Sequence, residues 1–145
     1  MYKNKKVPAH FAFCFQQGCA KEATCLHKLA CQYVEKEKQQ IICVNPLHVE
    51  GQEGEHCPCY EETVQVEMAR GFLNALGTVP SAKVETVAQE LIKKFNRSYY
   101  YRMRKGTMPI TPSQQEVIAQ VLIKAGAPAP IVFDSYETDY LWDRE

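Results

Sequence analysis

The sequence predicts a mainly α-helical protein in which a small cysteine-rich, metal-stapled module precedes about four helices and an extended aromatic tail. Two observations predict this class. All seven cysteines lie between Cys14 and Cys59. After Cys59, apolar residues recur at helical spacing instead. We therefore place the module at residues 1–60 and the helical bundle with its tail at residues 61–145, and expect the two parts to form one compact unit.

Composition excludes several classes of protein. The 145 residues carry no net charge, and their 46% hydrophobic content is ordinary for a folded protein. No run approaches the roughly 18 apolar residues that cross a bilayer. The N-terminal residues lack the apolar core of a signal peptide. We expect a protein of the bacterial cytoplasm with no membrane partner.

The first half contains two predicted elements. Residues 22–37 are expected to form a helix, because apolar side chains fall on one of its faces, namely Leu26, Leu29, Ala30 and Tyr33. Residues 41–45 have the β-branched composition of a strand and end at Pro46.

The second half begins with three predicted helices. The apolar spacing predicts the first over residues 64–76, ended by Gly77. The second is expected over residues 84–95, with Ser81 as a candidate N-cap. The third is short, from about residue 98 to 105, and Gly106 closes it.

The last predicted helix carries the clearest start signal. Thr111 is placed to cap it, Pro112 suits its first position, and Gln114 completes a capping box. Gly126 marks its end. The aromatic residues that follow are expected to lie extended across the bundle and to dock Trp142 on it.

The cysteines indicate a metal site. Reducing conditions in the cytosol and an odd number of cysteines argue against a disulfide framework. On one helix, Cys25 and Cys31 would face directions about 240° apart, so they are not expected to share an ion. Cys43 lies in an apolar strand and is interpreted as a small buried hydrophobe. The predicted ligands are therefore Cys14, Cys19, Cys25 and Cys57.

Zinc is the cofactor that a closed set of four thiolates favours. A [4Fe–4S] cluster is the alternative, because its ligands include a cysteine followed by proline, as Cys57 is. Cys59 or His56 is an alternative fourth ligand. A further interpretation is that the cysteines are simply free thiols in the interior.

The whole pattern resembles a known but uncharacterised family of small bacterial proteins. The residues that carry the resemblance are Cys14, Cys19 and Cys25, the segment 44–46, the Cys57–Pro58 pair, the segment 95–106 and the segment 111–115. The resemblance supports the architecture and implies no activity. In that family an aromatic residue commonly follows the Cys-Pro pair, and Cys59 occupies this place here.

A basic segment predicts a partner. Six Lys or Arg residues and no acid lie between Lys93 and Lys105. The segment resembles the recognition helix of helix-turn-helix proteins, which contacts phosphates and bases. The predicted contact set for DNA or RNA is Arg97, Tyr99, Arg102, Arg104 and Lys105. The alternative is a short helix whose tyrosines pack on the bundle while its charges are solvated.

No catalytic signature is visible, so the sequence argues against an enzyme more than for one. The leading hypothesis is a metal-binding protein that acts as a nucleic-acid-binding or regulatory module. An iron–sulfur protein with redox or sensing work is the first alternative. The second is a protein-interaction module, with an unknown protein partner and no role in nucleic-acid binding.

Overall fold

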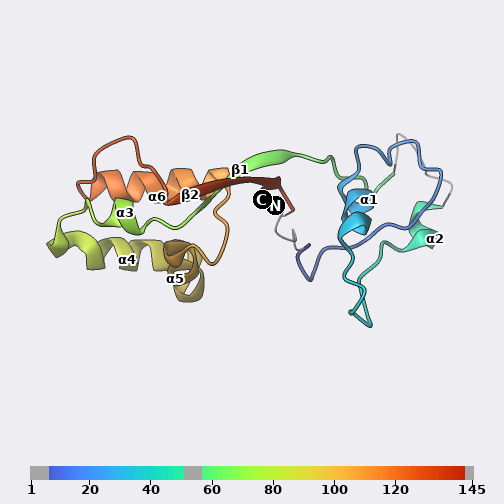
Figure 1. The fold of residues 1–145 in the computed structure, drawn as a ribbon, viewed down its shortest axis with the longest axis horizontal. Helices are drawn as coiled ribbons and strands as arrows, with labels where there is room; N and C mark the ends of the chain where they lie inside the picture. Colours follow the sequence, from blue (N-terminus) through green and yellow to red (C-terminus); the bar gives the residue numbers. More distant parts are fainter. Residues whose placement is uncertain (1–6, 51–56, 143–145) are drawn as a thin grey trace. The chain divides into compact units, whose positions relative to one another are not determined.

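The computed structural model describes residues 7–50 and 57–142, and the chain divides into two compact units (Figure 1). The N-terminal unit comprises residues 1–65 and 140–145, and the C-terminal unit comprises residues 66–139. The described residues form six α-helices, one 3₁₀ helix and a two-stranded antiparallel sheet. The fold is therefore mixed α/β, and the prediction of a mainly α protein is wrong.

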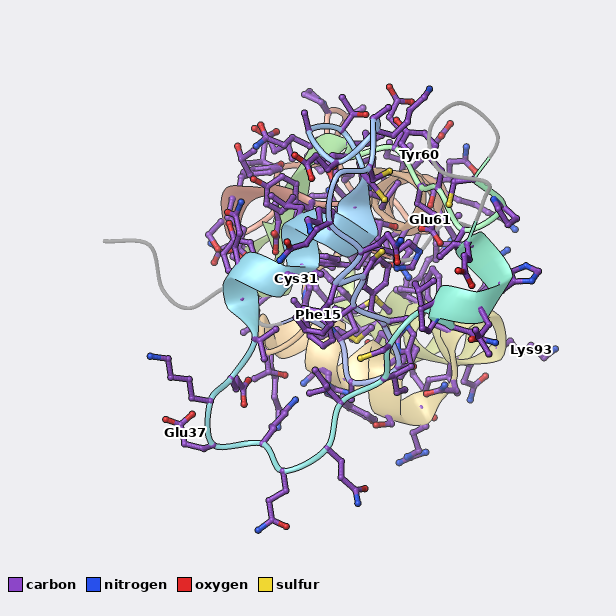
Figure 2. The ribbon with its side chains drawn as sticks, turned by 90° about the vertical axis from the view of Figure 1, so that its right-hand side faces the viewer. Phe15, Cys31, Glu37, Tyr60, Glu61 and Lys93 are labelled. Carbon is purple, nitrogen blue, oxygen red and sulfur yellow. The ribbon has the colours of Figure 1, made fainter. Side chains whose placement is uncertain are left out.

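The helices of the N-terminal unit are short. They are α1 (Leu26–Ala30), the 3₁₀ helix η1 (Cys31–Tyr33) and α2 (Pro46–Val49). The helix expected over residues 22–37 begins only after Cys25, because the chain before it pairs with a distant segment. The amide of Leu26 donates to the carbonyl of Glu61 at 2.7 Å, and Thr63 donates to Thr24 at 2.8 Å. The segment that carries Glu37 then loops outward (Figure 2).

The N-terminal unit has an apolar core of its own. Its buried residues are Val7, Phe11, Phe13, Leu26, Ala30 and Trp142. The rings of Phe11 and Trp142 meet edge to face at 5.1 Å. Trp142 thus belongs to this core, and the expectation that it docks on the helical bundle is corrected.

A buried histidine joins three segments of this unit. His27 donates from Nδ1 to the carbonyl oxygen of Ala12 at 2.7 Å, and its Nε2 lies 3.2 Å from a carboxylate oxygen of Glu61. The imidazole also stacks on Phe11 at 4.5 Å between ring centroids. These contacts, with the apolar core, stabilise the unit.

Strand β1 (Gln65–Arg70) pairs with β2 (Ser135–Tyr140), and all of their residues except Gln65 and Tyr140 belong to the C-terminal unit. A short helix, α3 (Leu73–Leu76), follows β1. The helix predicted over residues 64–76 is therefore a strand for half its length. Pairing with a partner some 65 residues away overrides the apolar spacing, because strand preference depends on neighbours more than on local sequence.

Three longer helices complete this unit, and each confirms a predicted element. They are α4 (Ser81–Phe95), α5 (Arg97–Lys105) and α6 (Pro112–Lys124). The predicted capping box is present, since Thr111 and Gln114 bond each other's backbone amides. Gly106 ends α5 with a φ of 86°, a left-handed conformation that glycine adopts readily. Among the described residues, no helix is long and apolar enough to cross a membrane.

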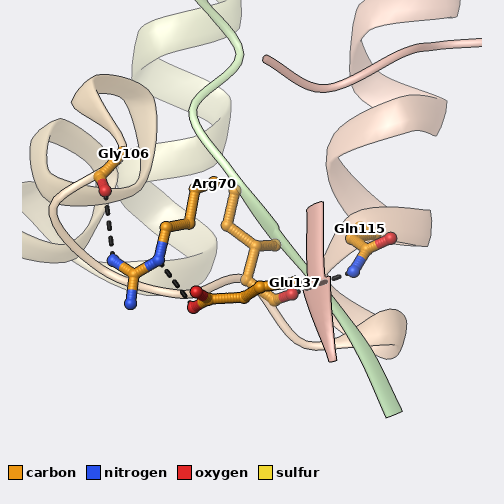
Figure 3. Close-up of polar contacts among 5 residues, drawn as sticks. Arg70, Gly106, Gln115 and Glu137 are labelled. Atoms are coloured by element: carbon orange, nitrogen blue, oxygen red, sulfur yellow. Dashed lines mark hydrogen bonds and ion pairs between the residues drawn. The ribbon is translucent and has the colours of Figure 1, made fainter. Parts of the chain in front are cut away.

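Polar contacts fasten the end of α5 to the sheet (Figure 3). The guanidinium of Arg70 donates to the carboxylate of Glu137 at 2.7 Å and to the carbonyl oxygen of Gly106 at 3.2 Å. The side-chain amide of Gln115 donates to the carbonyl of Glu67 at 2.9 Å. Both strands and the loop after α5 are therefore held together.

Candidate functional site

Helix α5 presents two different faces. On the inner face, Tyr100 and Met103 are fully buried in the core of the C-terminal unit. The ring of Tyr100 packs at 6.1 Å from that of Phe72. The side chain of Asn96 accepts a hydrogen bond from the amide of Tyr99 at 2.9 Å and so caps the helix. The backbone of α5 is thereby fixed by both packing and capping.

The outer face of α5 carries an aromatic ring and two cations. Tyr99 is 41% exposed, and Arg102 and Lys105 are exposed as well. Their spacing of three residues places them along one side of the helix. Arg97 is exposed in the first turn, and its guanidinium carbon lies 5.5 Å from the centre of the Tyr101 ring.

Arg104 does not share this face. It is half-buried, and its guanidinium carbon lies 5.4 Å from the Tyr101 ring centre and 6.0 Å from that of Tyr100. Its Nε is buried and has no hydrogen-bond partner among the described residues. Of the five predicted contact residues, Arg104 thus has a packing role, and the other four are exposed.

Two further lysines extend the positive charge beyond α5. Lys93 and Lys94 are exposed in the last turn of α4, and Lys93 points away from its helix (Figure 2). Asn96 alone separates this helix from α5. No acidic residue lies between positions 91 and 115. We call the following exposed residues the basic surface: Lys93, Lys94, Arg97, Tyr99, Arg102 and Lys105.

The predicted contact set leaves out Lys93 and Lys94, although both belong to the basic segment. Their place at the end of the helix predicted over residues 84–95, just before Arg97, is the sequence signal that points to them. Cations in the last turn of a helix also interact favourably with the negative end of its dipole, so these two lysines stabilise α4 where they lie.

All seven cysteines are free thiols. The pKa of Cys59 is raised, first by burial and then by the neighbouring thiols of Cys57, Cys14 and Cys25. These four side chains therefore share one electrostatic environment. Cys19, a predicted ligand, is not among the groups that act on Cys59.

Cys31 lies beside Cys14. Its thiol donates to the carbonyl oxygen of Cys14, with 3.0 Å between sulfur and oxygen. Burial raises the pKa of Cys31, and this effect is opposed by the hydrogen bond to Cys14 and by the charge of Lys28. Cys43 differs from its interpretation as a buried hydrophobe, since its side chain is exposed.

The prediction of a metal-stapled module is wrong for the described residues. They contain no group of three or more His, Cys, Asp or Glu side chains arranged to hold a metal ion. The described part of the unit is held instead by its apolar core and by the contacts of His27. His56 lies outside the described residues. The assignment of zinc or an iron–sulfur cluster to particular thiols stays a prediction from the sequence.

The fold and its side chains define a mixed α/β protein with a thiol-rich unit and a helical unit that bears a basic surface. The chain belongs to a family of unknown function (DUF6078), whose profile matches residues 1–142. This confirms the expected membership of an uncharacterised family. No curated protein and no solved structure matches the chain.

Proposed function

We propose that the C-terminal unit binds nucleic acid through its basic surface. One observation carries the proposal: Tyr99, Arg102 and Lys105 are exposed along one side of a helix whose opposite side is fixed in the core. Exposed cations attract phosphates, and binding releases the counterions that surround nucleic acid. An exposed tyrosine adds a surface on which an unpaired base can stack.

The absence of acidic residues from positions 91–115 supports the proposal, because no carboxylate in that segment weakens the attraction of phosphate. Arg104 and Arg97 contribute in a different way. Their guanidinium groups lie near the Tyr101 ring, where cation–π attraction favours an ordered arrangement.

The proposal assumes no particular groove geometry. A helix-turn-helix unit joins its helices by a turn of about three or four residues. Here Asn96 alone connects α4 to α5, with φ and ψ of 81° and 166°. We therefore rest the proposal on charge and exposure, and expect binding of the sequence-independent kind, with a Kd on the order of 10⁻⁴ to 10⁻⁶ M at physiological salt.

The test is fluorescence anisotropy with labelled duplex DNA and single-stranded RNA over a range of salt concentrations. The variant Arg102→Gln/Lys105→Gln should bind more weakly. If both cations contact phosphates of duplex DNA, the slope of log K against log salt should fall by about 1.8, since each contact contributes about 0.9.

The matched control is Lys83→Gln/Lys124→Gln, which removes two exposed charges from α4 and α6 away from the basic surface. It should bind almost as well as the wild type at the same salt concentration. Equal losses of affinity in the two double variants would show that binding depends on net charge alone, and would contradict the assignment of binding to the basic surface. No binding by the folded wild-type protein at low salt would refute the proposed function.

A further inference from the structure

Three consecutive tyrosines lie in the first half of α5, and each has a different environment. Tyr100 is fully buried, and its ring packs against that of Phe72. The ring of Tyr101 is half-buried and meets the ring of Tyr100 edge to face at 5.0 Å between centroids. Tyr99 is 41% exposed, and its ring makes no aromatic or cation–π contact with another described residue. Tyr99 is therefore the tyrosine whose ring is accessible to a ligand.

The backbone that carries Tyr99 is fixed. Its amide donates to the side chain of Asn96 at 2.9 Å, and the next residue, Tyr100, is held in the core. A tyrosine side chain has two rotatable bonds, so it loses little conformational entropy when a ligand covers it. The ring of Tyr99 is thus a preorganised contact surface.

Two cations continue the line that Tyr99 begins. Arg102 follows Tyr99 by three residues and Lys105 follows by six, so the three side chains lie along one side of α5 over about 9 Å of its axis. Both cations are exposed, and neither charged group has an ion pair or a cation–π contact with another described residue. Both charges are therefore available to a ligand that reaches Tyr99.

This combination of a ring and cations distinguishes between forms of nucleic acid. Phosphates are present in duplexes and in single strands, so Arg102 and Lys105 attract both. The bases of a duplex are stacked on one another, and a base that leaves the stack to contact a protein costs unpairing and unstacking energy. The bases of a single strand are free to stack on an aromatic side chain. The ring of Tyr99 therefore adds affinity only for the single strand.

We infer that the basic surface binds single-stranded nucleic acid, with an unpaired base stacked on Tyr99 and the adjoining phosphates at Arg102 and Lys105. This inference rests on the proposed function and names its substrate class. Every base has a π face, so the preference is for strandedness and not for sequence. RNA and DNA share this chemistry.

Salt concentration should separate the two contributions. Salt weakens the phosphate contacts, and it does so more steeply for a duplex, at about 0.9 per contact, than for a single strand, at about 0.7. Stacking of a base on Tyr99 is not a contact between charges, so salt does not screen it in this way. The preference for single strands over duplexes should therefore increase as salt is added.

The test measures fluorescence anisotropy with four labelled probes of equal length: single-stranded RNA, single-stranded DNA, duplex DNA and an abasic strand that keeps the phosphates. The full-length protein should bind the ordinary single strands at least about fivefold more tightly than the abasic strand. Tyr99→Leu should remove this difference and leave the salt slope and the binding of duplex DNA unchanged. Tyr99→Phe should bind as the wild type does, because it keeps the ring.

The matched control is Tyr136→Leu, which removes a tyrosine of similar exposure, 43%, from β2 and should not affect binding. Equal affinity for the ordinary and abasic strands, or unchanged binding by Tyr99→Leu, would overturn the stacking. Tighter binding of the duplex at every salt concentration would overturn the preference for single strands. In these cases the proposed function still stands if Arg102→Gln/Lys105→Gln weakens binding. No binding of any probe at low salt would refute the proposed function, and this inference with it.

Discussion

The guanidinium of Arg70 and the carboxylate of Glu137 form a side-chain link between the two strands, at 2.7 Å between Nε and Oε1 (Figure 3). The same guanidinium donates to the carbonyl of Gly106 at the end of α5. One side chain of β1 therefore holds both its partner strand and the loop that closes the helix of the basic surface.

Glu137→Gln should destabilise the protein only slightly. The side chains of Arg70 and Glu137 are 34% and 43% exposed, so water and salt screen their attraction. Pairs of this kind contribute up to about 1 kcal/mol. Urea unfolding at low ionic strength should show a loss within that range, and the loss should shrink in high salt.

A double-mutant cycle with Arg70→Met separates the ion pair from the bond to Gly106. Arg70→Met should lower the free energy of unfolding more than Glu137→Gln does. It leaves the half-buried carbonyl of Gly106 without its hydrogen-bond donor. If the two single variants cost the same and the coupling energy equals each of them, the contact with Gly106 contributes nothing.

Gly71→Ala should be among the more damaging single-methyl changes in the C-terminal unit. Gly71 has a φ of +75°, and an added Cβ would lie 2.6 Å from Oδ2 of Asp134. That carboxylate accepts hydrogen bonds from the amides of Leu73 and Asn74 and so caps the start of α3. We expect a loss of about 2–3 kcal/mol in the free energy of unfolding, from strain and the lost cap together.

Gly18→Ala provides the control for strain alone. Its φ of +74° is nearly the same, yet nothing lies within 4 Å of an added Cβ. This change should cost about 1 kcal/mol. Equal costs at the two positions would show that Asp134 moves aside without losing its hydrogen bonds.

The sequence predicts elements well where their signals are local. Helix α6 starts where Thr111 and Gln114 indicate, and α5 ends at Gly106, because caps depend on residues three or four positions apart. Strand β1 was misread as a helix, since its partner is β2, far along the chain. The amphipathic spacing within residues 64–76 carries no information about that pairing.

The candidate sites show the same difference between features that depend on local sequence and features that depend on distant contacts. The charges of α5 are visible in the sequence, but the burial of Arg104 depends on how Tyr100 and Tyr101 pack. Cys43 was interpreted as buried because its neighbours are apolar. The structure instead exposes its side chain and pairs its backbone with that of Phe13, a contact across 30 positions that no local pattern reveals.

Tyr100→Phe should leave stability unchanged or raise it slightly. Tyr100 is fully buried, and its hydroxyl has no hydrogen-bond partner among the described residues. Removing a buried hydroxyl without a partner removes a desolvation penalty, which amounts to about 1–3 kcal/mol when nothing compensates it. Thermal unfolding of this variant should therefore show an equal or higher Tm. A loss above about 1 kcal/mol would show that water or another group satisfies the hydroxyl.

Tyr100→Ala is the companion change. It removes a large ring from the core and should cost about 3–5 kcal/mol. Nucleic-acid binding by Tyr100→Phe should match the wild type, because this side chain lies on the inner face of α5. Weakened binding by a stable Tyr100→Phe variant would show that the ring hydroxyl contributes to the basic surface.

The free energy of unfolding should fall at alkaline pH, because the buried thiol of Cys31 loses its proton there. Burial raises the pKa of Cys31 above its ordinary value of 9.0. The folded state therefore keeps the proton to a higher pH than the unfolded state does. The resulting contribution is fully present below pH 9.0 and is lost as the pH rises through the folded pKa. Urea unfolding under reducing conditions at several pH values from neutral to alkaline should show this decline.

The variant Cys31→Ala separates the contribution of this thiol from those of lysines and tyrosines, which titrate in the same pH range. The difference in unfolding free energy between wild type and variant should be constant at neutral pH and should narrow above pH 9.0, because the wild type alone loses the contribution of Cys31. Parallel curves for wild type and Cys31→Ala across the alkaline range would mean that burial of Cys31 does not favour its protonated form.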